Sequence, residues 1–174
     1  MSKTDQLRQD LQAARRRYDG LRRGQTAALR RRRSADEVVL EAIYWHVGGA
    51  LAHTRRDLPH VVLLFPLAPQ LHSTARTFSF GRFLRRHLGD SDGAMLRFRR
   101  LLASGDRDEL DHRLRGVLRL ACADKSPVDW GVLGADILQF FNTESDHVRR
   151  RWAQDFYAPI FHNDADSAAA TSNA

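Results

Sequence analysis

Arginine is the residue whose number and spacing in this chain point most directly to a chemistry, the binding of phosphate groups. Of the 28 basic residues among 174, only Lys3 and Lys125 are lysines. Residues 8–33 hold ten arginines against two acids, Asp10 and Asp19, so this segment carries +8 and the rest of the chain −1. Guanidinium groups bind phosphate through charge-assisted, often bidentate hydrogen bonds. A basic field concentrated in one segment favours a polyanionic partner, most often nucleic acid, although a GC-rich genome would also enrich arginine over lysine.

A second set of arginines follows in residues 76–119, where eleven arginines stand against six acids. Many of them flank apolar positions with helical spacing, so we expect them to point outward when the core closes. An ordinary solvated helix face would look the same for any single arginine, but few nearby acids are available to neutralise the set. Such residues contact the nucleic-acid backbone without reading base sequence. The sequence has no zinc finger or single-strand RNA motif that would indicate sequence-specific reading.

Residues suited to catalysis are scarce. The lone cysteine, Cys122, lies at the apolar end of a predicted helix, where a buried and inert thiol is expected rather than a nucleophile. The sequence has neither a phosphate-binding loop with its lysine nor a glycine-rich dinucleotide fingerprint. We therefore predict that the protein is not an enzyme and needs no cofactor.

Two groups of residues could hold metal ions, and both have a simpler interpretation. His46, His53 and His60 recur every seven residues, which would align the first two on one helical face, but no acid or cysteine follows at metal-ligand spacing. The four acids in residues 106–111 resemble a two-metal nuclease cluster, yet carboxylates in a first helical turn are favoured by the helix dipole alone. We therefore predict no metal site.

The elements that must position the arginines are predicted to be helices throughout. Apolar residues recur with the 3.6-residue period, and Ser34, Ser79 and Asp106 are in N-cap positions. The predicted helices span residues 5–18, 34–54, 79–88, 94–103, 106–121, 130–142 and about 146–157, the last capped by Ser145 or Asp146. Residues 61–65 are interpreted as a buried helical turn rather than a strand, and residues 20–24 and 67–79 as loops. The fold class is therefore all-α, with roughly eight helices.

The large aromatic residues belong to the predicted core. Trp130, Trp152 and Phe156 occupy apolar helical positions, which favours burial over stacking on nucleic-acid bases. No stretch of the chain is long and apolar enough to span a membrane, and the N-terminus lacks the apolar centre of a secretory signal. We therefore expect a cytoplasmic protein with no membrane partner, and the small polar residues at 163–174 predict a disordered tail.

Several short stretches, taken in order, match one known family. They are Leu21-Arg22-Arg23-Gly24, Leu29-Arg30-Arg31, Ser79-Phe80-Gly81-Arg82, Phe98-Arg99-Arg100-Leu101-Leu102, Asp106-Arg107 with Leu110, Pro127-Val128-Asp129-Trp130, and the block from Val148 to Tyr157. The sequence resembles the CasB family, the small subunit of the type I-E CRISPR surveillance complex Cascade. The resemblance extends over about residues 6–157.

This resemblance implies a fold and a set of partners. The fold is an all-α domain of two small helical lobes, which we place at residues 1–162. The implied role is that of a non-enzymatic Cascade subunit that helps to hold the guide RNA–target DNA hybrid and the displaced strand of the R-loop. The implied partners are the guide RNA, both strands of the target DNA, other Cascade subunits and further copies of the same chain.

The matching motifs also indicate which arginines contact phosphate. The candidates are Arg22, Arg23, Arg30, Arg31, Arg82, Arg97, Arg99, Arg107, Arg113 and Arg115. Arginines 149–151 are expected to face neighbouring subunits or to cap the last helix. The alternative hypothesis is a protein–protein interaction module whose arginines dock on acidic subunit surfaces. A free-standing transcription regulator would need a recognition helix, and the sequence offers none.

Overall fold

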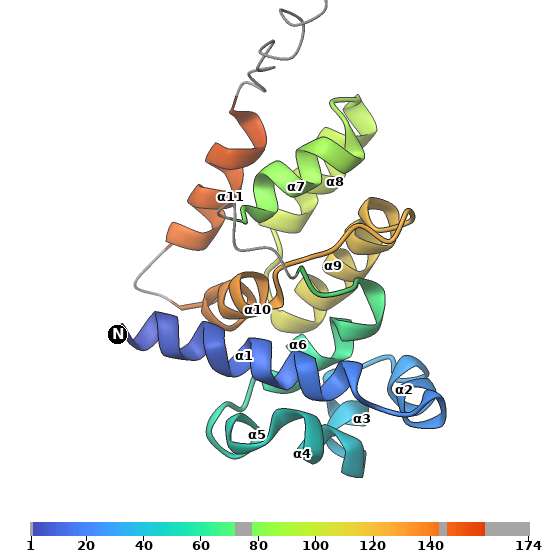
Figure 1. The fold of residues 1–174 in the computed structure, drawn as a ribbon. Coiled ribbons are helices and arrows are strands. Elements are labelled where there is room, and N and C mark those ends of the chain that lie inside the picture. Colours follow the sequence, from blue (N-terminus) through green and yellow to red (C-terminus); the bar gives the residue numbers. More distant parts are fainter. Residues whose placement is uncertain (1, 72–77, 143–145, 159–174) are drawn as a thin grey trace, which may run out of the picture.

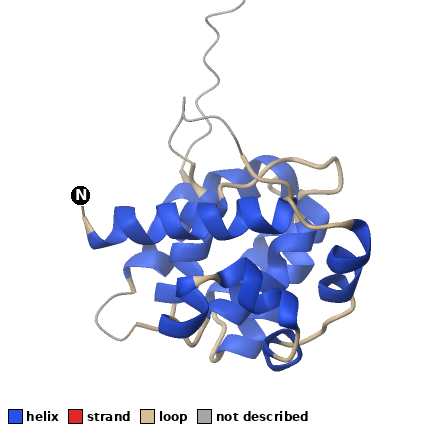
Figure 2. Cartoon of the chain, turned by 60° about the horizontal axis from the view of Figure 1, so that its bottom comes forward, coloured by secondary structure: helices blue, strands red, loops and turns tan. Residues whose placement is uncertain are grey.

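The structure is a computed structural model that describes residues 2–71, 78–142 and 146–158. The predicted tail at 163–174, the middle of the predicted loop at 67–79 and the possible cap Ser145 lie outside these ranges. The described part contains eleven α-helices, one 3₁₀ turn and no strand (Figures 1 and 2). These are α1 (Lys3–Asp19), α2 (Arg23–Arg30), α3 (Ala35–Val39), α4 (Ala42–Gly48), α5 (Ala50–Thr54), α6 (Leu58–Leu64), η1 (Phe65–Leu67), α7 (Phe80–Leu88), α8 (Asp92–Leu102), α9 (Arg107–Ala121), α10 (Trp130–Gln139) and α11 (His147–Tyr157).

The all-α prediction is confirmed, but the expected number of helices, roughly eight, is too low. The helix predicted for residues 34–54 is three helices, α3, α4 and α5. The chain turns at Gly49, whose φ of +55° is strained for other residues. Arg17 of α1 donates hydrogen bonds to the carbonyls of Val47 and Gly48, which the end of α4 leaves without helical partners. His46 and His53 therefore lie on two different helices, not on one face of a single helix.

The remaining extra helix is α2. It begins inside the stretch of residues 20–24 that was predicted as a loop, and it ends at Arg30. Leu29 is buried and fixes α2 against the core. The basic run of residues 30–33 thus starts at the end of a helix instead of following an open loop.

The predicted helix starts are confirmed at three positions. The side-chain oxygens of Ser34, Ser79 and Asp106 accept hydrogen bonds from the backbone N–H groups three residues later, as N-caps do. Asp146 precedes α11 without a side-chain capping bond.

The short helix α6 lies at the centre of the molecule. Every residue of this helix except His60 is buried, and the helix packs against α3, α4, α9 and α10. Residues 61–64 complete α6 and Phe65 begins η1, so the interpretation of residues 61–65 as helical rather than extended is confirmed.

The helices fall into two groups that share one core. In one group α1 packs against α10 and α4, and in the other α7 packs against α11 and α9 (Figure 1). A single hydrophobic cluster contains residues from both groups. Trp130, Trp152 and Phe156 are all buried in it, so their assignment to the core is confirmed. The indole N–H of Trp130 donates to the carbonyl of Ala68 at 3.1 Å.

Helices α7 and α11 approach each other at the Ser79–Arg82 motif. Ser79 donates a hydrogen bond to Asp155 at 2.7 Å. A Cβ atom placed on Gly81 would lie 2.3 Å from the carbonyl oxygen of Trp152, closer than any real contact of this kind. Ser79 and Gly81 thus position the helix pair, and Arg82 extends outward, with 73% of its side chain exposed.

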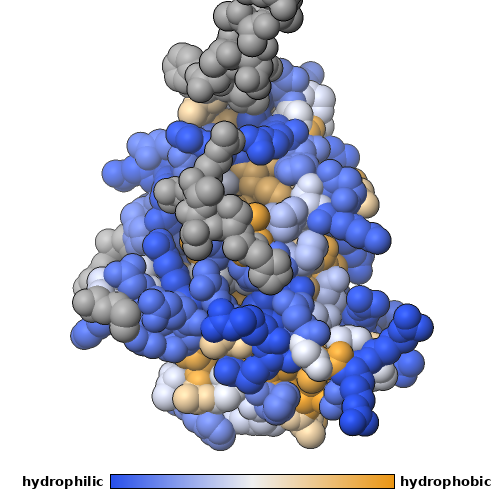
Figure 3. Space-filling model, viewed as in Figure 1, coloured by the Kyte–Doolittle hydropathy of each residue, from blue (hydrophilic) through white to orange (hydrophobic). Residues whose placement is uncertain are grey.

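The surface seen in Figure 3 is mostly hydrophilic and is interrupted by small apolar patches. None of the helices in the described part of the chain has the length and apolar character required to cross a lipid bilayer.

Candidate nucleic-acid interface

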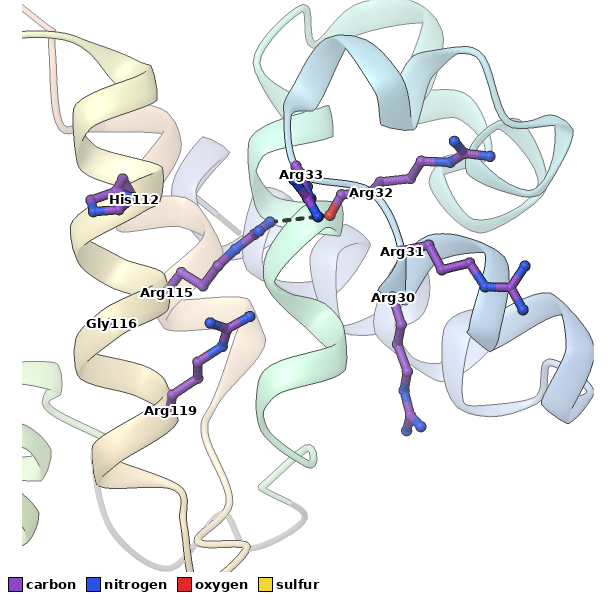
Figure 4. Close-up of a pocket in the computed structure, with 8 residues that line it drawn as sticks. All are labelled: Arg30, Arg31, Arg32, Arg33, His112, Arg115, Gly116 and Arg119. Carbon is purple, nitrogen blue, oxygen red and sulfur yellow. Dashed lines mark hydrogen bonds between the residues drawn. The ribbon is translucent and has the colours of Figure 1, made fainter.

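A cleft of about 800 Å³ lies between α9 and the segment that links α2 to α3 (Figure 4). Its lining is almost entirely basic: Arg30, Arg31, Arg32, Arg33, His112, Arg115, Gly116 and Arg119. Two basic stretches that are about 80 residues apart in the sequence therefore meet in space. We call this feature the arginine cleft.

Helical spacing builds the α9 wall of the arginine cleft. Arg115 and Arg119 are one turn apart, and both extend from α9 toward the linking segment (Figure 4). The opposite face of α9 carries Leu114, Val117 and Leu118, which are buried. Packing of these apolar residues orients the two guanidinium groups outward.

The other wall is held by contacts of Arg32. Its carbonyl accepts a hydrogen bond of 3.4 Å from Arg115, the one contact that Figure 4 draws across the cleft. Its guanidinium group forms an ion pair with Glu41 and points away from α9. The side chain of Arg31 also points away from α9, so it lies on the outer side of this wall.

The charge of the arginine cleft is largely uncompensated. In the ranges the structure describes, no carboxylate lies within 4.0 Å of the guanidinium groups of the remaining cleft arginines, Arg30, Arg31, Arg33, Arg115 and Arg119. Burial lowers the pKa of Arg115, and the nearby charge of Arg119 lowers it further, while the carboxylates of Asp111 and Glu37 act against this shift. Arginine stays charged at neutral pH despite such shifts. The cleft therefore concentrates like charges, whose repulsion a bound anion would relieve.

A smaller pocket of about 450 Å³ adjoins the cleft at Arg30, which lines both. Lys125, Pro69 and Tyr18 are also in its lining. The hydroxyl group of Tyr18 is buried and has no hydrogen-bond partner among the described atoms. Arg30 and Lys125 thus line one pocket, together with Asp19, which pairs with Arg15.

The predicted site residues divide into three sets. Arg30, Arg31 and Arg115 line the arginine cleft. Two others are held in ion pairs on the first turns of α9: Arg107 contacts Asp57 at 2.8 Å, and Arg113 pairs with Glu109. The remaining five are exposed outside the cleft, and these are Arg22 and Arg23 near the start of α2, Arg82 on α7, and Arg97 and Arg99 on α8.

Besides Gly116, four residues of the cleft are absent from the sequence-based candidates: Arg32, Arg33, His112 and Arg119. Two signals were available in the sequence. Arg33 continues the run that begins at Arg30, and Arg119 follows Arg115 by four residues, which places both on one side of a helix. The contact between α9 and the linking segment depends on the tertiary packing of the helices, which the sequence does not reveal.

Other arginines serve the fold itself. Arg149 donates to the carbonyl of Ser104 at 2.9 Å, and Arg151 pairs with the buried Asp136. The guanidinium group of Arg149 also lies 4.7 Å from the ring centre of Phe140. Both side chains thus bind groups of their own chain around α11.

Comparison with known proteins identifies the family. The model of the family described as CRISPR-associated protein Cse2 matches residues 20–157. The chain belongs to the Cse2 family. Members of the Cse2 family, which is also called CasB, are structural subunits of the CRISPR Cascade complex, so the predicted family is confirmed. Membership implies association with the other Cascade subunits and the guide RNA.

A solved structure shows the same fold. The crystal structure of CasB from Thermobifida fusca matches with a TM-score of 0.62 and 21% sequence identity, over 89% of this chain and 97% of that one. A search of curated proteins finds no match.

Proposed function

We propose that this Cse2-family chain is a non-enzymatic Cascade subunit that binds nucleic-acid backbone in the arginine cleft, without sequence specificity, and thereby stabilises the R-loop. One observation supports the proposal: Arg30, Arg115 and Arg119, from two distant segments, line one cleft, and none of them has a carboxylate within ion-pair distance among the described residues. Such a surface binds a phosphate chain and leaves the bases unread.

This chemistry fits the energetics of R-loop formation. Pairing of the guide RNA with the target strand replaces one duplex by another of similar stability, so contacts to the backbone decide the balance. The guide supplies the sequence reading, and the protein needs only to neutralise phosphates. In this proposal the partners are the guide RNA, both strands of the target DNA, the other Cascade subunits and further copies of the chain. The two helix groups act as the two lobes of the single domain predicted for residues 1–162.

The experiment that tests the proposal measures R-loop formation by the assembled complex at several salt concentrations. Replacing Arg115 and Arg119 together by alanine removes two phosphate contacts. The slope of log affinity against log salt should then fall by about 2, roughly one unit for each arginine. The matched control replaces Arg55 and Arg56, two adjacent exposed arginines outside the cleft, and should leave the slope unchanged.

Two results would contradict the proposal. Equal slopes for the wild type and the Arg115/Arg119 variant would show that the cleft does not contact phosphate. Failure of this variant to enter the complex, together with unchanged nucleic-acid binding by the free chain, would instead favour docking of the arginines on acidic subunit surfaces.

A further inference from the structure

Three side chains with metal-binding atoms meet where α6 packs against α9. His60 lies on α6, and Asp108 and Asp111 lie on α9. One ligand atom from each of them lies within 4.8 Å of the other two. Nδ1 of His60 is 2.6 Å from Oδ2 of Asp111. In the sequence His60 is about 50 residues from the two acids, so neither the histidine spacing nor the acidic cluster indicates this arrangement.

The second carboxylate oxygen of Asp111 has no protein group to bind. The residue is only 6% exposed, and Oδ1 is buried without a hydrogen-bond partner in the described part of the chain. The hydrogen bond with His60 involves only Oδ2. A buried carboxylate oxygen without a partner is costly, since it loses water and gains nothing in return. A cation bound at this oxygen would remove that cost.

The helix dipole accounts for Asp108, which lies in the first turn of α9, but not for Asp111. Asp106 caps α9, and the carboxylate of Glu109 accepts a hydrogen bond from the N–H of Gly105, so both serve the start of the helix. Asp111 lies in the second turn, where the dipole effect has faded. Asp108 and Asp111 are three residues apart and so lie side by side on α9, next to His60.

We propose that His60, Asp108 and Asp111 form a binding site for a divalent transition-metal ion, with Zn²⁺ as the best fit. One imidazole nitrogen and two carboxylate oxygens are a ligand set that suits Zn²⁺, which binds three protein ligands and one water at about 2.0–2.2 Å. Mg²⁺ and Ca²⁺ prefer sites made only of oxygen ligands. The two carboxylates balance the charge of the ion, and the exposed side chain of Asp108 gives access from solvent.

Two neighbouring guanidinium groups already have partners of their own. The guanidinium group of Arg107 is paired with Asp57, and that of Arg115 is directed to the carbonyl of Arg32. A bound ion would tie α6 to α9, the helix whose later turns form one wall of the arginine cleft. The site requires no nucleic acid, so its test is independent of the proposed function.

The experiment titrates the chelator-treated full-length protein with ZnCl₂ and follows binding by calorimetry and by the thermal unfolding midpoint. We expect one Zn²⁺ per chain and an increase of the midpoint that depends on Zn²⁺ concentration. Asp108→Asn should weaken binding at least tenfold. It should change the midpoint of the metal-free protein little, because Asp108 is exposed and makes no hydrogen bond or ion pair among the described residues.

Asp36→Asn is the matched control, because Asp36 is an exposed acid in the first turn of α3, away from His60. It should bind Zn²⁺ as the wild type does. His60→Gln and Asp111→Asn should also lose Zn²⁺ binding. If either variant fails to fold, the Zn²⁺ affinity of Asp108→Asn still tests the proposal. The proposal is overturned if the wild type binds no Zn²⁺, if Asp108→Asn binds it as tightly as Asp36→Asn does, or if Mg²⁺ binds more tightly than Zn²⁺.

Discussion

Arg15 of α1 and two arginines of the arginine cleft, Arg30 and Arg33, belong to the same basic segment of residues 8–33, yet they have opposite environments. Arg15 is 4% exposed, pairs with Asp19 at 2.7 Å and lies over the ring of Tyr18. Arg30 and Arg33 are exposed and have no carboxylate within ion-pair distance among the described residues. A count of charges along the sequence therefore overstates the charge available to a partner, because part of it is used inside the fold.

The difference between the two regions follows from helical position. Leu11, Ala14 and Tyr18 form the buried stripe of α1, and Arg15 lies within it at i+4 from Leu11. Its guanidinium group must find partners in the core, and it donates to the carbonyl of Phe65 as well as to Asp19. Arg31 and Arg33 follow the end of α2, where no apolar stripe directs them inward. The position of an arginine relative to the apolar stripe thus predicts its role better than its place in a charge cluster does.

The largest expected effect comes from removing the buried arginine. Arg15→Ala leaves the carbonyl of Phe65 and the carboxylate of Asp19 without their donor, and should lower the free energy of unfolding by about 3 kcal/mol. Arg31→Ala, from the same basic segment, should change it by less than about 0.5 kcal/mol. Urea unfolding followed by circular dichroism measures both. Equal losses of unfolding free energy in the two variants would show that the buried and the exposed arginine contribute equally to stability.

A chemical probe can sharpen the same comparison. Cys122 lines the pocket beside Arg15, and burial together with Asp124 raises its pKa to about 12. The thiol therefore stays protonated at pH 8, and labelling of the native protein should be about a thousandfold slower than that of the unfolded chain. Arg15→Ala should accelerate labelling and Arg31→Ala should not, as a thiol-reactive chromophore would report. Rapid labelling of the wild type would show that this region opens readily.

The smallest effect is expected at Arg82, which lies between the two extremes. Its nearest carboxylate oxygen, on Asp155, is 3.9 Å from Nε, and most of the side chain is exposed. Exposed pairs of this kind contribute little, so Arg82→Ala should change the free energy of unfolding by less than about 0.5 kcal/mol. A chemical denaturation curve tests this, and a loss above 1 kcal/mol would place Arg82 with the structural arginines.

Local patterns in the sequence predicted most of the fold. Apolar periodicity and the caps at Ser34, Ser79 and Asp106 located the long helices, because these features act within a few residues of the chain. The break at Gly49 was not predicted, since the carbonyls it frees are satisfied by Arg17, a residue of another helix. The division of residues 34–54 into three helices thus depends on tertiary contacts.

The candidate site was predicted only in part for the same reason. Arg30, Arg31 and Arg115 were among the candidates, but their meeting depends on how α9 packs against the segment after α2. The partner of Arg107, Asp57, is 50 residues away and could not be inferred. The pairing of Arg113 with Glu109, in contrast, has the i, i+4 spacing of a helical ion pair and was visible in the sequence.

The close approach of α7 and α11 at Gly81 limits how this part of the molecule can evolve. Even a methyl group there would overlap the backbone of Trp152. A substitution at this position can be accepted only if the two helices also move apart, which would disturb the contact between Phe80 and Trp152, whose ring centres are 4.7 Å apart. A substitution on one of these two helices must therefore be accompanied by a compensating substitution on the other.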